Sequence, residues 1–426
     1  MRIFLDTIGC RLNHSEIEQM AAQFRTAGHA IVALPGEADL VVINTCTVTN
    51  AASSDSRQRI RQAAHAGAER IIVTGCWATI DPRGAANLPS VSRVVENARK
   101  NRLVEEVLGQ SYSERSNKIL PREPLPGRNR RTRAFIKVQD GCNNHCAYCI
   151  TRIARGAGKS RDLKEIFHDI KAAEYGGVKE IVLTGVNLGS WGQDFQEMKP
   201  LSDLIRHILC NTSIPRVRLS SIEPWDINDD FLDLIENPRF CKHLHLPLQS
   251  GSKQTLKHMA RQITPDGFAL IVDRLRAKDP GLAITTDIMV GFPGETIEEF
   301  NESLEFVERM QFSRGHVFQY SPRPGTVAAN MPFQIPPDVK QHRSAIIRGV
   351  VSKSQLSYEQ SFIGAVVKVL WEKAVQTESG LWLLDGLSGN YLKIRSVSSI
   401  NMWNKLSEVK VLRQDKRYLI GEIIDD

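Results

Sequence analysis

The 426-residue sequence predicts an α/β protein with several domains, because short apolar runs alternate with helix-period segments over most of its length. Over residues 1–109 this alternation indicates an open parallel sheet domain. Over residues 134–360 six strand–helix units in series indicate a partial (β/α)6 barrel. Residues 361–426 carry short strand-like runs separated by turn residues, which is typical of a small β-barrel.

The apolar runs place the individual elements in order. In the first part, strands are expected at 2–5, 39–44 and 70–74, and helices at about 15–27, 52–66 and 98–108. The barrel strands are expected at 134–139, 179–184, 216–221, 242–246, 283–289 and 314–320, with helices between them. A proline-rich stretch and a helix should fill 321–360. The last strands are expected at about 364–374, 381–386, 391–397, 407–413 and 418–424.

Residues 110–133 interrupt the alternation with three prolines, a glycine and several arginines. We interpret them as a basic linker, which is equally consistent with a solvated connector that has no partner. The formal net charge of the whole chain is +7, which permits an acidic partner such as RNA without establishing one.

Two further features of the sequence concern location. The chain contains no apolar run long enough to cross a membrane. Its first residues are typical of a strand and lack the pattern of a signal peptide. We therefore expect a cytoplasmic protein with no membrane partner.

A C-x-x-x-C-x-x-C loop at Cys142, Cys146 and Cys149 directly follows the first predicted barrel strand. Thiolates are the usual ligands of iron–sulfur clusters, and a cubane cluster takes four ligands. Three cysteines therefore hold three irons and leave the fourth open to a substrate or cofactor. The alternatives are a zinc knuckle, to which His145 offers a fourth ligand, and a chance cluster.

The segments that follow the other barrel strands are rich in glycine and small polar residues, where a backbone approaches a ligand closely. In barrels of this kind the chemistry gathers at the carboxyl ends of the strands. Each segment alone is also consistent with an ordinary turn between strand and helix. The residues that we expect to contact a nucleotide-sized cofactor are Gly185, Asn187, Ser221, Glu223, Gln249, Ser250 and Gly291.

Three more cysteines, Cys10, Cys46 and Cys76, each lie just past the end of a predicted N-terminal strand. Since open parallel sheets bind ligands at that edge, the three should converge there. A second cluster, a zinc site, a redox trio and three unrelated buried cysteines all remain open. Cys210 and Cys241 lie in apolar or helical contexts and are expected to be structural.

The motifs around both sets of cysteines resemble the methylthiotransferase family of radical S-adenosylmethionine (SAM) enzymes. The N-terminal set is T-x-G-C-x-x-N, N-T-C-x-V and T-G-C, and the central set adds HLHLPLQSGS, DIMVGFPGET and YSPRPGT to the Cys142 loop. The C-terminal part looks like the family's TRAM domain, a small barrel associated with RNA binding. The resemblance covers essentially the whole chain.

This resemblance implies two 4Fe–4S clusters and SAM as cofactors. Cys142, Cys146 and Cys149 would hold the catalytic cluster, whose open iron binds SAM and generates a 5′-deoxyadenosyl radical. The auxiliary cluster would be held by the second triad. The six expected metal ligands are therefore Cys10, Cys46, Cys76, Cys142, Cys146 and Cys149.

The opening TIGCRLNHSEIEQM, with Arg11 and Asn13, looks most like the branch that adds a methylthio group to carbon 2 of N-threonylcarbamoyl-adenosine at position 37 of tRNA. The implied partners are tRNA, an unidentified electron donor and an unidentified sulfur source. The alternatives are the same chemistry on isopentenyl-adenosine of tRNA or on a ribosomal-protein aspartate. A non-catalytic iron–sulfur protein that binds RNA or transfers electrons is an alternative of a different class.

The C-terminal part is nearly neutral, with nine Lys and Arg against eight Asp and Glu in 361–426. Because RNA affinity depends largely on neutralised phosphates, this composition argues against RNA binding by that part alone. The basic residues that we consider instead are Arg128–Arg133, Lys393, Arg395, Lys410 and Arg413, for which a role as solvated side chains stays open.

Overall fold

The computed structural model describes residues 1–109 and 119–424. The chain divides into two compact units, each assembled from several stretches of sequence. The first unit comprises Met1–Asn144, Cys149–Val178 and Leu183–Met198. The second comprises His145–Tyr148, Lys179–Val182 and Lys199–Asp426.

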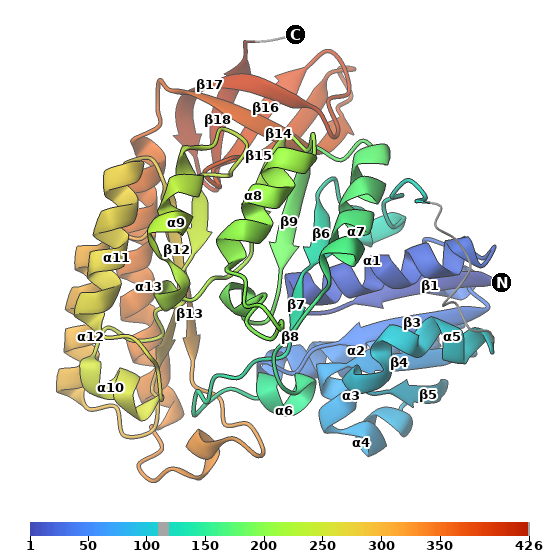
Figure 1. Cartoon of the computed structure of the whole chain (residues 1–426), viewed down its shortest axis with the longest axis horizontal. Helices are drawn as coiled ribbons and strands as arrows, with labels where there is room; N and C mark the ends of the chain where they lie inside the picture. Colours follow the sequence, from blue (N-terminus) through green and yellow to red (C-terminus); the bar gives the residue numbers. More distant parts are fainter. Residues whose placement is uncertain (110–118, 425–426) are drawn as a thin grey trace. The chain divides into compact units, whose positions relative to one another are not determined.

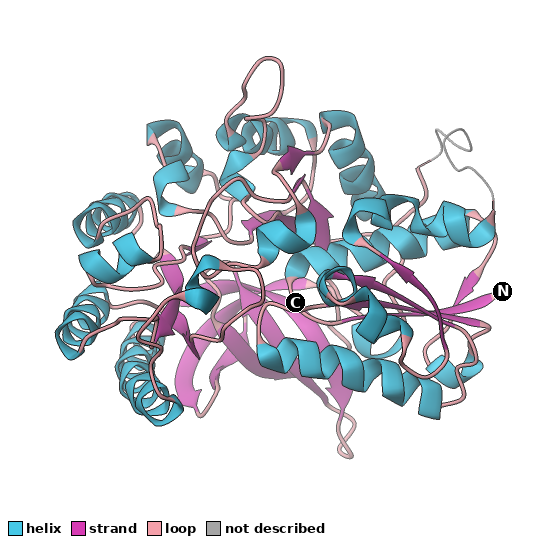
Figure 2. Cartoon of the chain, turned by 90° about the horizontal axis from the view of Figure 1, so that it is seen from below, coloured by secondary structure: helices cyan, strands magenta, loops and turns pink. Residues whose placement is uncertain are grey.

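A five-stranded parallel sheet forms the N-terminal part of the first unit, in the order β2-β1-β3-β4-β5. Its strands are β1 (Arg2–Thr7), β2 (Ala30–Ile31), β3 (Leu40–Thr45), β4 (Ile71–Gly75) and β5 (Val91–Val95). Its helices are α1 (Arg11–Thr26), α2 (Asn50–His65), α3 (Cys76–Ile80), α4 (Pro82–Ala86) and α5 (Leu103–Leu108). Parallel neighbours require a crossover, and these helices lie on both faces of the sheet (Figure 2).

The two-residue period of the strands distributes their side chains between the two faces. Val42 packs in a buried cluster with Phe24 of α1, whereas Val41 and Ile43 pack in another with Ile60 of α2. Full burial of a side chain of this size contributes about 1.5–3 kcal/mol. The apolar runs of β1, β3 and β4 are therefore buried on both sides, as the sequence predicts for a parallel sheet.

Six further strands follow one another along the chain. They are β6 (Ala134–Lys137), β9 (Glu180–Thr184), β10 (Arg216–Leu219), β11 (His243–His245), β12 (Ala283–Val290) and β13 (Arg314–Gln319). β9 contributes residues to both units and lies between β6 and β10 in a three-stranded sheet, and β11, β12 and β13 form another. Parallel bridges Val217–Phe240 and Ser221–His245 join β10 to the segment of β11. Strand order thus follows sequence order, which confirms the partial barrel.

Helices accompany these strands as predicted, and Figure 1 shows α11, α12 and α13 beside β12 and β13. The long helices are α7 (Leu163–Tyr175), α8 (Leu201–Asn211), α11 (Pro265–Lys278), α12 (Ile297–Met310) and α13 (Pro337–Gln360). The predicted helix between β10 and β11 is present as the short α9 (Asp229–Leu232). Short elements that the sequence does not predict are β7 (Gln139–Asp140), β8 (Lys159–Ser160), α6 (Thr151–Arg155) and α10 (Lys253–His258), together with β2, β5, α3 and α4 of the N-terminal part. Elements of two to six residues are too short for an apolar period to identify them.

The C-terminal strands close into a barrel in the order β14-β15-β16-β18-β17. They are β14 (Val366–Gln376), β15 (Trp382–Ser388), β16 (Lys393–Ser398), β17 (Leu406–Asp415) and β18 (Tyr418–Ile423). Buried Val369, Trp371 and Leu384 belong to its core, and the Trp371 indole Nε1 donates to Ser407 Oγ at 2.6 Å. Closure leaves the sheet without a free edge, as predicted for this part.

The α/β class and its three architectures are therefore confirmed. The domain limits 1–109, 110–133, 134–360 and 361–426 stay predictions, and residues 110–118 of the predicted linker lie outside the described residues. Within the described part of the chain, no helix is both long and apolar enough to cross a membrane.

A buried ion pair fixes the barrel to β10 within the second unit. Arg218, which is fully buried, donates to the Glu180 carboxylate at 2.7 and 3.2 Å and to the backbone carbonyls of Ser388 and Gly389 at 3.0 Å each. The Arg216 Nε lies 3.2 Å from the same carboxylate. One carboxylate thus holds two guanidinium groups that contact the barrel turn.

We predict that Glu180→Gln destabilises the protein by about 3–5 kcal/mol, because it leaves buried arginines without a counter-charge. A lowered thermal unfolding temperature is the measurement. The matched control is Asp203→Asn, which removes an exposed pair with Arg206 at 3.4 Å and should change stability by less than about 1 kcal/mol. Equal effects of the two variants would contradict the role of Glu180.

Candidate functional site

Cys10, Cys46 and Cys76 lie at one edge of the N-terminal sheet, because β1, β3 and β4 are neighbours that end there. Cys46 and Cys76 are buried. Cys10, directly before α1, exposes much of its residue surface, but its thiol group lies in surroundings that exclude water. Burial and, to a smaller extent, the charges of Cys10 and Cys76 raise the pKa of the Cys46 thiol to about 11. The three thiols therefore lie close enough together for the charge of one to affect the pKa of another.

Two glycines allow the chain to turn directly before two of these cysteines. Gly9 and Gly75 have φ of +104° and +99°, a region that disfavours residues with a side chain. A Cβ at Gly75 would lie 2.3 Å from the Thr45 carbonyl oxygen, and one at Gly9 would lie 2.7 Å from Cys46 Sγ. The Thr45 backbone packs against the turn at Gly75 and the Cys46 side chain against the turn at Gly9, so only glycine fits at either position.

Asn13 ties two of the cysteine turns together. Its amide donates to the carbonyls of Ile8 and Thr45 at 2.8 and 3.1 Å, and its Oδ1 lies 3.7 Å from Cys10 Sγ. Around Cys46 the backbone N–H donates to Ser56 Oγ at 3.0 Å, and the Cys46 carbonyl accepts from the same hydroxyl. These bonds fix the backbone on which the thiols are presented.

A buried network of charges adjoins this edge, and the sequence does not predict it. Arg155 donates to Glu16 at 2.8 Å, to Asp140 at 2.9 Å and to Asn13 Oδ1 at 2.6 Å. Lys100 lies 2.8 Å from Glu16, and Lys137 reaches both Glu16 and Asp140 at 3.2 and 2.5 Å. We call these five residues the Glu16 network, namely Glu16, Lys100, Lys137, Asp140 and Arg155.

The Glu16 network has one more cation than anions. Burial alone would raise the pKa of Glu16, but the surrounding cations hold it well below its usual range, so the carboxylate stays ionised. Burial also raises the pKa of the Cys10 thiol, and the positive charge of Arg155 opposes that effect. The surplus positive charge therefore favours negative charge at the cysteine edge.

Three thiols at one edge beside a positive surplus fit an anionic iron–sulfur cluster. Among residues 1–109 and 119–424, no group of three or more His, Cys, Asp or Glu side chains is arranged to hold a metal ion. In a cubane cluster each cysteine ligates a different iron atom, so its ligands do not converge on a single ion. The six cysteines as metal ligands stay a prediction.

The Cys142 loop begins at β7 and is shaped within the first unit by its own backbone. Cys142 N donates to the Gly156 carbonyl at 3.1 Å, and Gly141, with φ of +65°, passes so close to Ala157 that a Cβ would lie 1.9 Å from its carbonyl oxygen. Gln139 Oε1 accepts from the backbone N–H groups of Val186 and Asn187 at 3.0 Å each. Gln139, which the sequence did not single out, thus connects this loop to the end of β9.

Cys146 belongs to the second unit, together with an arginine that sequence reasoning also missed. Arg261 donates to the Glu223 carboxylate at 3.0 and 2.7 Å, and its guanidinium lies 4.8 Å from the Trp225 ring. The Arg261 Nη1 lies 3.9 Å from Cys146 Sγ. Glu223, predicted to contact a cofactor, is therefore also the ion-pair partner of a cation that reaches the cysteine loop.

Several buried polar atoms at the carboxyl ends of the barrel strands have no hydrogen-bond partner among the described residues. In the first unit this is Asn187 Oδ1. In the second unit Ser220 Oγ, Gln249 Oε1 and Tyr320 OH follow β10, β11 and β13. Since buried polar groups are normally paired, the three atoms of the second unit fit a polar ligand such as SAM at the rim of that unit.

The remaining predicted contacts lie at the same strand ends. Ser221 bridges to His245, Ser250 is fully buried beside Gln249, and Gly291 has φ of +71°. A Cβ at Gly291 would lie 2.4 Å from the Lys340 side chain. The tight turn at Gly291 therefore has a packing reason, and cofactor contact by these residues stays a prediction.

Two sequence families match this chain. The family described as the radical SAM superfamily matches residues 136–307, and the one described as "Uncharacterized protein family UPF0004" matches residues 2–96. A radical SAM methyltransferase from Kitasatospora setae, TsrM, has a similar fold, with a TM-score of 0.58 at 13% identity over 77% of each chain. The central fold and the cysteine loop are thus those of a radical SAM enzyme.

Relatives with curated names narrow the class. The "Threonylcarbamoyladenosine tRNA methylthiotransferase MtaB" of Bacillus subtilis is 35% identical, covering 98% of this chain and 95% of the relative. That of Thermotoga maritima is 38% identical over 86% of each. The "tRNA-2-methylthio-N(6)-dimethylallyladenosine synthase" of Clostridium tetani is 31% identical over 98% and 95%. The chain belongs to the methylthiotransferase family of radical SAM enzymes and is of its MtaB type.

Asp226, in the turn after β10, is a partly buried acid at the strand-end rim of the second unit. Its Oδ2 has no hydrogen-bond partner within the described residues. Burial, with a further contribution from the charge of Glu223, raises its pKa from 3.8 to about 7. The folded chain therefore holds this proton over a pH range in which the unfolded chain has released it.

Between about pH 4 and pH 7 the stability contributed by this group falls as the pH rises, since the folded state binds more protons than the unfolded state. We predict that Asp226→Asn has little effect below about pH 4, raises the unfolding temperature progressively between about pH 4 and pH 7, and gives a constant difference above that range. The control Asp230→Asn, at an exposed site, should give a pH-independent difference. A flat difference for Asp226→Asn as well would contradict a buried titrating carboxyl.

Proposed function

We propose that this enzyme adds a methylthio group to carbon 2 of N-threonylcarbamoyl-adenosine at position 37 of tRNA. The observation that carries the proposal is the 35% and 38% identity, over most of the chain, to relatives named for this substrate. A tRNA substrate also favours the cytoplasmic location that the sequence predicts.

We propose that Cys142, Cys146 and Cys149 hold the 4Fe–4S cluster that reacts with SAM, and that Cys10, Cys46 and Cys76 hold the auxiliary cluster. When bound, these cofactors supply a carbon-centred radical that removes hydrogen from the substrate and the sulfur group that replaces it. The electron donor and the sulfur source remain partners of unassigned identity.

The chain's own residues position these groups and control their surroundings. Gly75 and Asn13 fix the turns that present the auxiliary thiols. The Arg155 guanidinium donates to Asn13, which fixes the turn at Cys10, and to Asp140, which lies two residues before Cys142. One side chain therefore positions parts of both cysteine motifs. Positioning of this kind supplies much of an enzyme's rate enhancement, since a misplacement of about 1 Å costs roughly a hundredfold.

We predict that Gly75→Ala lowers the iron content of the anaerobically reconstituted protein from about eight to about four per chain, because one cubane is lost. The added Cβ would displace the Thr45 backbone and with it Cys76. The control is Gly67→Ala, where φ is +94° but no atom lies within 4 Å of the new Cβ. Full iron content in Gly75→Ala would overturn the assignment of Cys76.

The test of the substrate compares tRNA nucleosides from cells with and without this protein by mass spectrometry. We expect loss of the 2-methylthio derivative of threonylcarbamoyl-adenosine, with accumulation of the unmodified precursor. A loss confined to the methylthio derivative of isopentenyl-adenosine would move the protein to the branch represented by the Clostridium tetani relative.

A second measurement separates an enzyme from a non-catalytic iron–sulfur protein. The reduced holoenzyme given SAM and threonylcarbamoylated tRNA should release 5′-deoxyadenosine, whereas Cys142→Ala should not. No release from wild-type protein with full iron content would contradict catalysis.

A further inference from the structure

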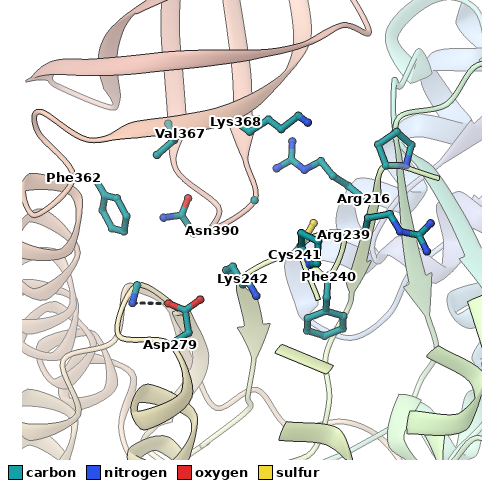
Figure 3. Close-up of a pocket in the computed structure, with 14 residues that line it drawn as sticks. Arg216, Arg239, Phe240, Cys241, Lys242, Asp279, Phe362, Val367, Lys368 and Asn390 are labelled. Atoms are coloured by element: carbon teal, nitrogen blue, oxygen red, sulfur yellow. Dashed lines mark hydrogen bonds between the residues drawn. The ribbon is translucent and has the colours of Figure 1, made fainter. Parts of the chain in front are cut away.

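A pocket of about 460 Å³ lies in the second unit, lined by the start of β10, the segment before β11 and the C-terminal barrel (Figure 3). It therefore lies at the amino-terminal ends of the barrel strands, whereas the predicted cofactor residues follow their carboxyl ends. In barrels of this kind the amino-terminal end normally contributes to stability and not to chemistry. The charges that line this pocket indicate that it also binds a ligand.

Four basic residues and one acid line the pocket, which leaves a formal surplus of three positive charges. The basic residues are Arg216, Arg239, Lys242 and Lys368, and the acid is Asp279. Arg239 is already occupied, because its guanidinium donates to backbone carbonyls at the end of α8. Asp279 accepts from the Gly281 N–H at 2.8 Å.

The two lysines are available to a ligand. The side-chain ammonium groups of Lys242 and Lys368 have no hydrogen-bond or ion-pair partner among the described residues of the second unit, although both residues belong to the backbone pairing of the sheets. Figure 3 places Lys368 on the barrel side of the pocket and Lys242 on the side of β11. Lys368 is exposed on β14, so its ammonium group reaches both solvent and the pocket.

Arg216 supplies a third donor, which has no nitrogen or oxygen acceptor among the described residues and meets only the Cys241 thiol. Only 5% of this residue is exposed, and the donor, its Nη2, is buried. Its other nitrogens pair with Glu180 and with the Leu387 carbonyl at 3.1 Å. The Cys241 thiol lies near Arg216 but is only a weak hydrogen-bond acceptor. Burial raises the pKa of this thiol, and the charge of Arg216 opposes that effect.

The direction of this donor is fixed by the barrel turn. A Cβ at Gly389 would lie 3.6 Å from the Arg216 Nη2, so that nitrogen faces the glycine in the pocket wall. A buried N–H without a partner costs about 1–3 kcal/mol. Glu180 is shared with Arg218, so the buried ion pair itself is left with excess positive charge. An anion in the pocket would accept a hydrogen bond from Arg216 and would also neutralise the excess positive charge of the ion pair.

We propose that this pocket binds a phosphate group through Arg216, Lys242 and Lys368, and that the phosphate belongs to the backbone of the RNA substrate. Guanidinium and ammonium donors converging from three segments are the chemistry by which proteins hold phosphates. Val366 and Lys368 are both exposed on β14, so a polymer can continue past the pocket along the barrel. The assignment to RNA rests on the proposed function, whereas the phosphate site does not.

The test uses the holoenzyme and an unmodified tRNA transcript, with affinity measured at several salt concentrations. Lys368→Glu should weaken binding about tenfold more than Lys373→Glu, and it should reduce the salt dependence by about one phosphate contact. Lys373 is exposed on the same strand outside the pocket, so both variants have the same net charge. Lys242→Gln should weaken binding in the same direction as Lys368→Glu.

A second arm identifies the source of the phosphate. Adenosine monophosphate and inorganic phosphate are titrated against wild type, Lys368→Glu and Lys373→Glu, with the unfolding temperature as readout. A rise in the unfolding temperature of wild type and Lys373→Glu but not of Lys368→Glu, with equal tRNA affinities for the two charge variants, would assign the pocket to a free nucleotide and overturn the RNA assignment. Identical behaviour of Lys368→Glu and Lys373→Glu in both arms would overturn the phosphate site. Absence of tRNA binding by wild type would contradict the proposed function, and the nucleotide arm would still decide the pocket.

Discussion

The ion pair between Arg155 and Glu16 is the interaction on which the cysteine edge depends. Glu16 lies on α1, one turn beyond Asn13, and both accept hydrogen bonds from the same guanidinium. That guanidinium also holds Asp140, which precedes the Cys142 loop. Removing one partner of a buried pair typically costs about 3–5 kcal/mol, more than a surface contact of similar geometry. A single side chain therefore fixes segments that belong to two different cysteine motifs.

The charges around this pair also define the environment of the thiols. Burial disfavours a thiolate, and it raises the pKa of Cys46 to about 11. A metal cluster requires thiolates, so cluster assembly must release protons that burial retains. The Glu16 network counters burial with its extra cation, and Arg155 acts directly on Cys10. Sheet topology thus brings the cysteines together, while the network makes that edge suitable for negative charge.

Sequence reasoning succeeds where a pattern is local. The N-terminal strands β1, β3 and β4 are apolar runs, and each cysteine of the N-terminal triad lies just past one of them, so parallel topology alone places all three at one edge. The Glu16 network has no such pattern, because Arg155 lies 139 positions from Glu16 and Lys100 lies 84 positions from it. Gln139 and Arg261 were not predicted for the same reason, because the hydrogen-bond partners that define their roles lie 38 or more positions away in the sequence and meet them only in the folded chain. The short α6, which carries Arg155, left no periodic signal.

The C-terminal barrel illustrates why total charge is a poor guide to binding. Its sequence is nearly neutral, and one basic residue predicted as a candidate for RNA contact, Arg395, pairs with Asp385 at 2.7 Å and lies over the Tyr418 ring. A cation held in this way gains little from a phosphate. Lys368 on the same barrel has no such partner among the described residues of its unit, and it lines a pocket with Arg216, whose remaining donor is buried without a nitrogen or oxygen acceptor among the described residues. Affinity for an anion depends on hydrogen-bond donors and cations that have no partner within the protein. A domain with little net charge can therefore still contribute to anion binding, here where Lys368 of the barrel lies beside the incompletely neutralised Arg216 of the core.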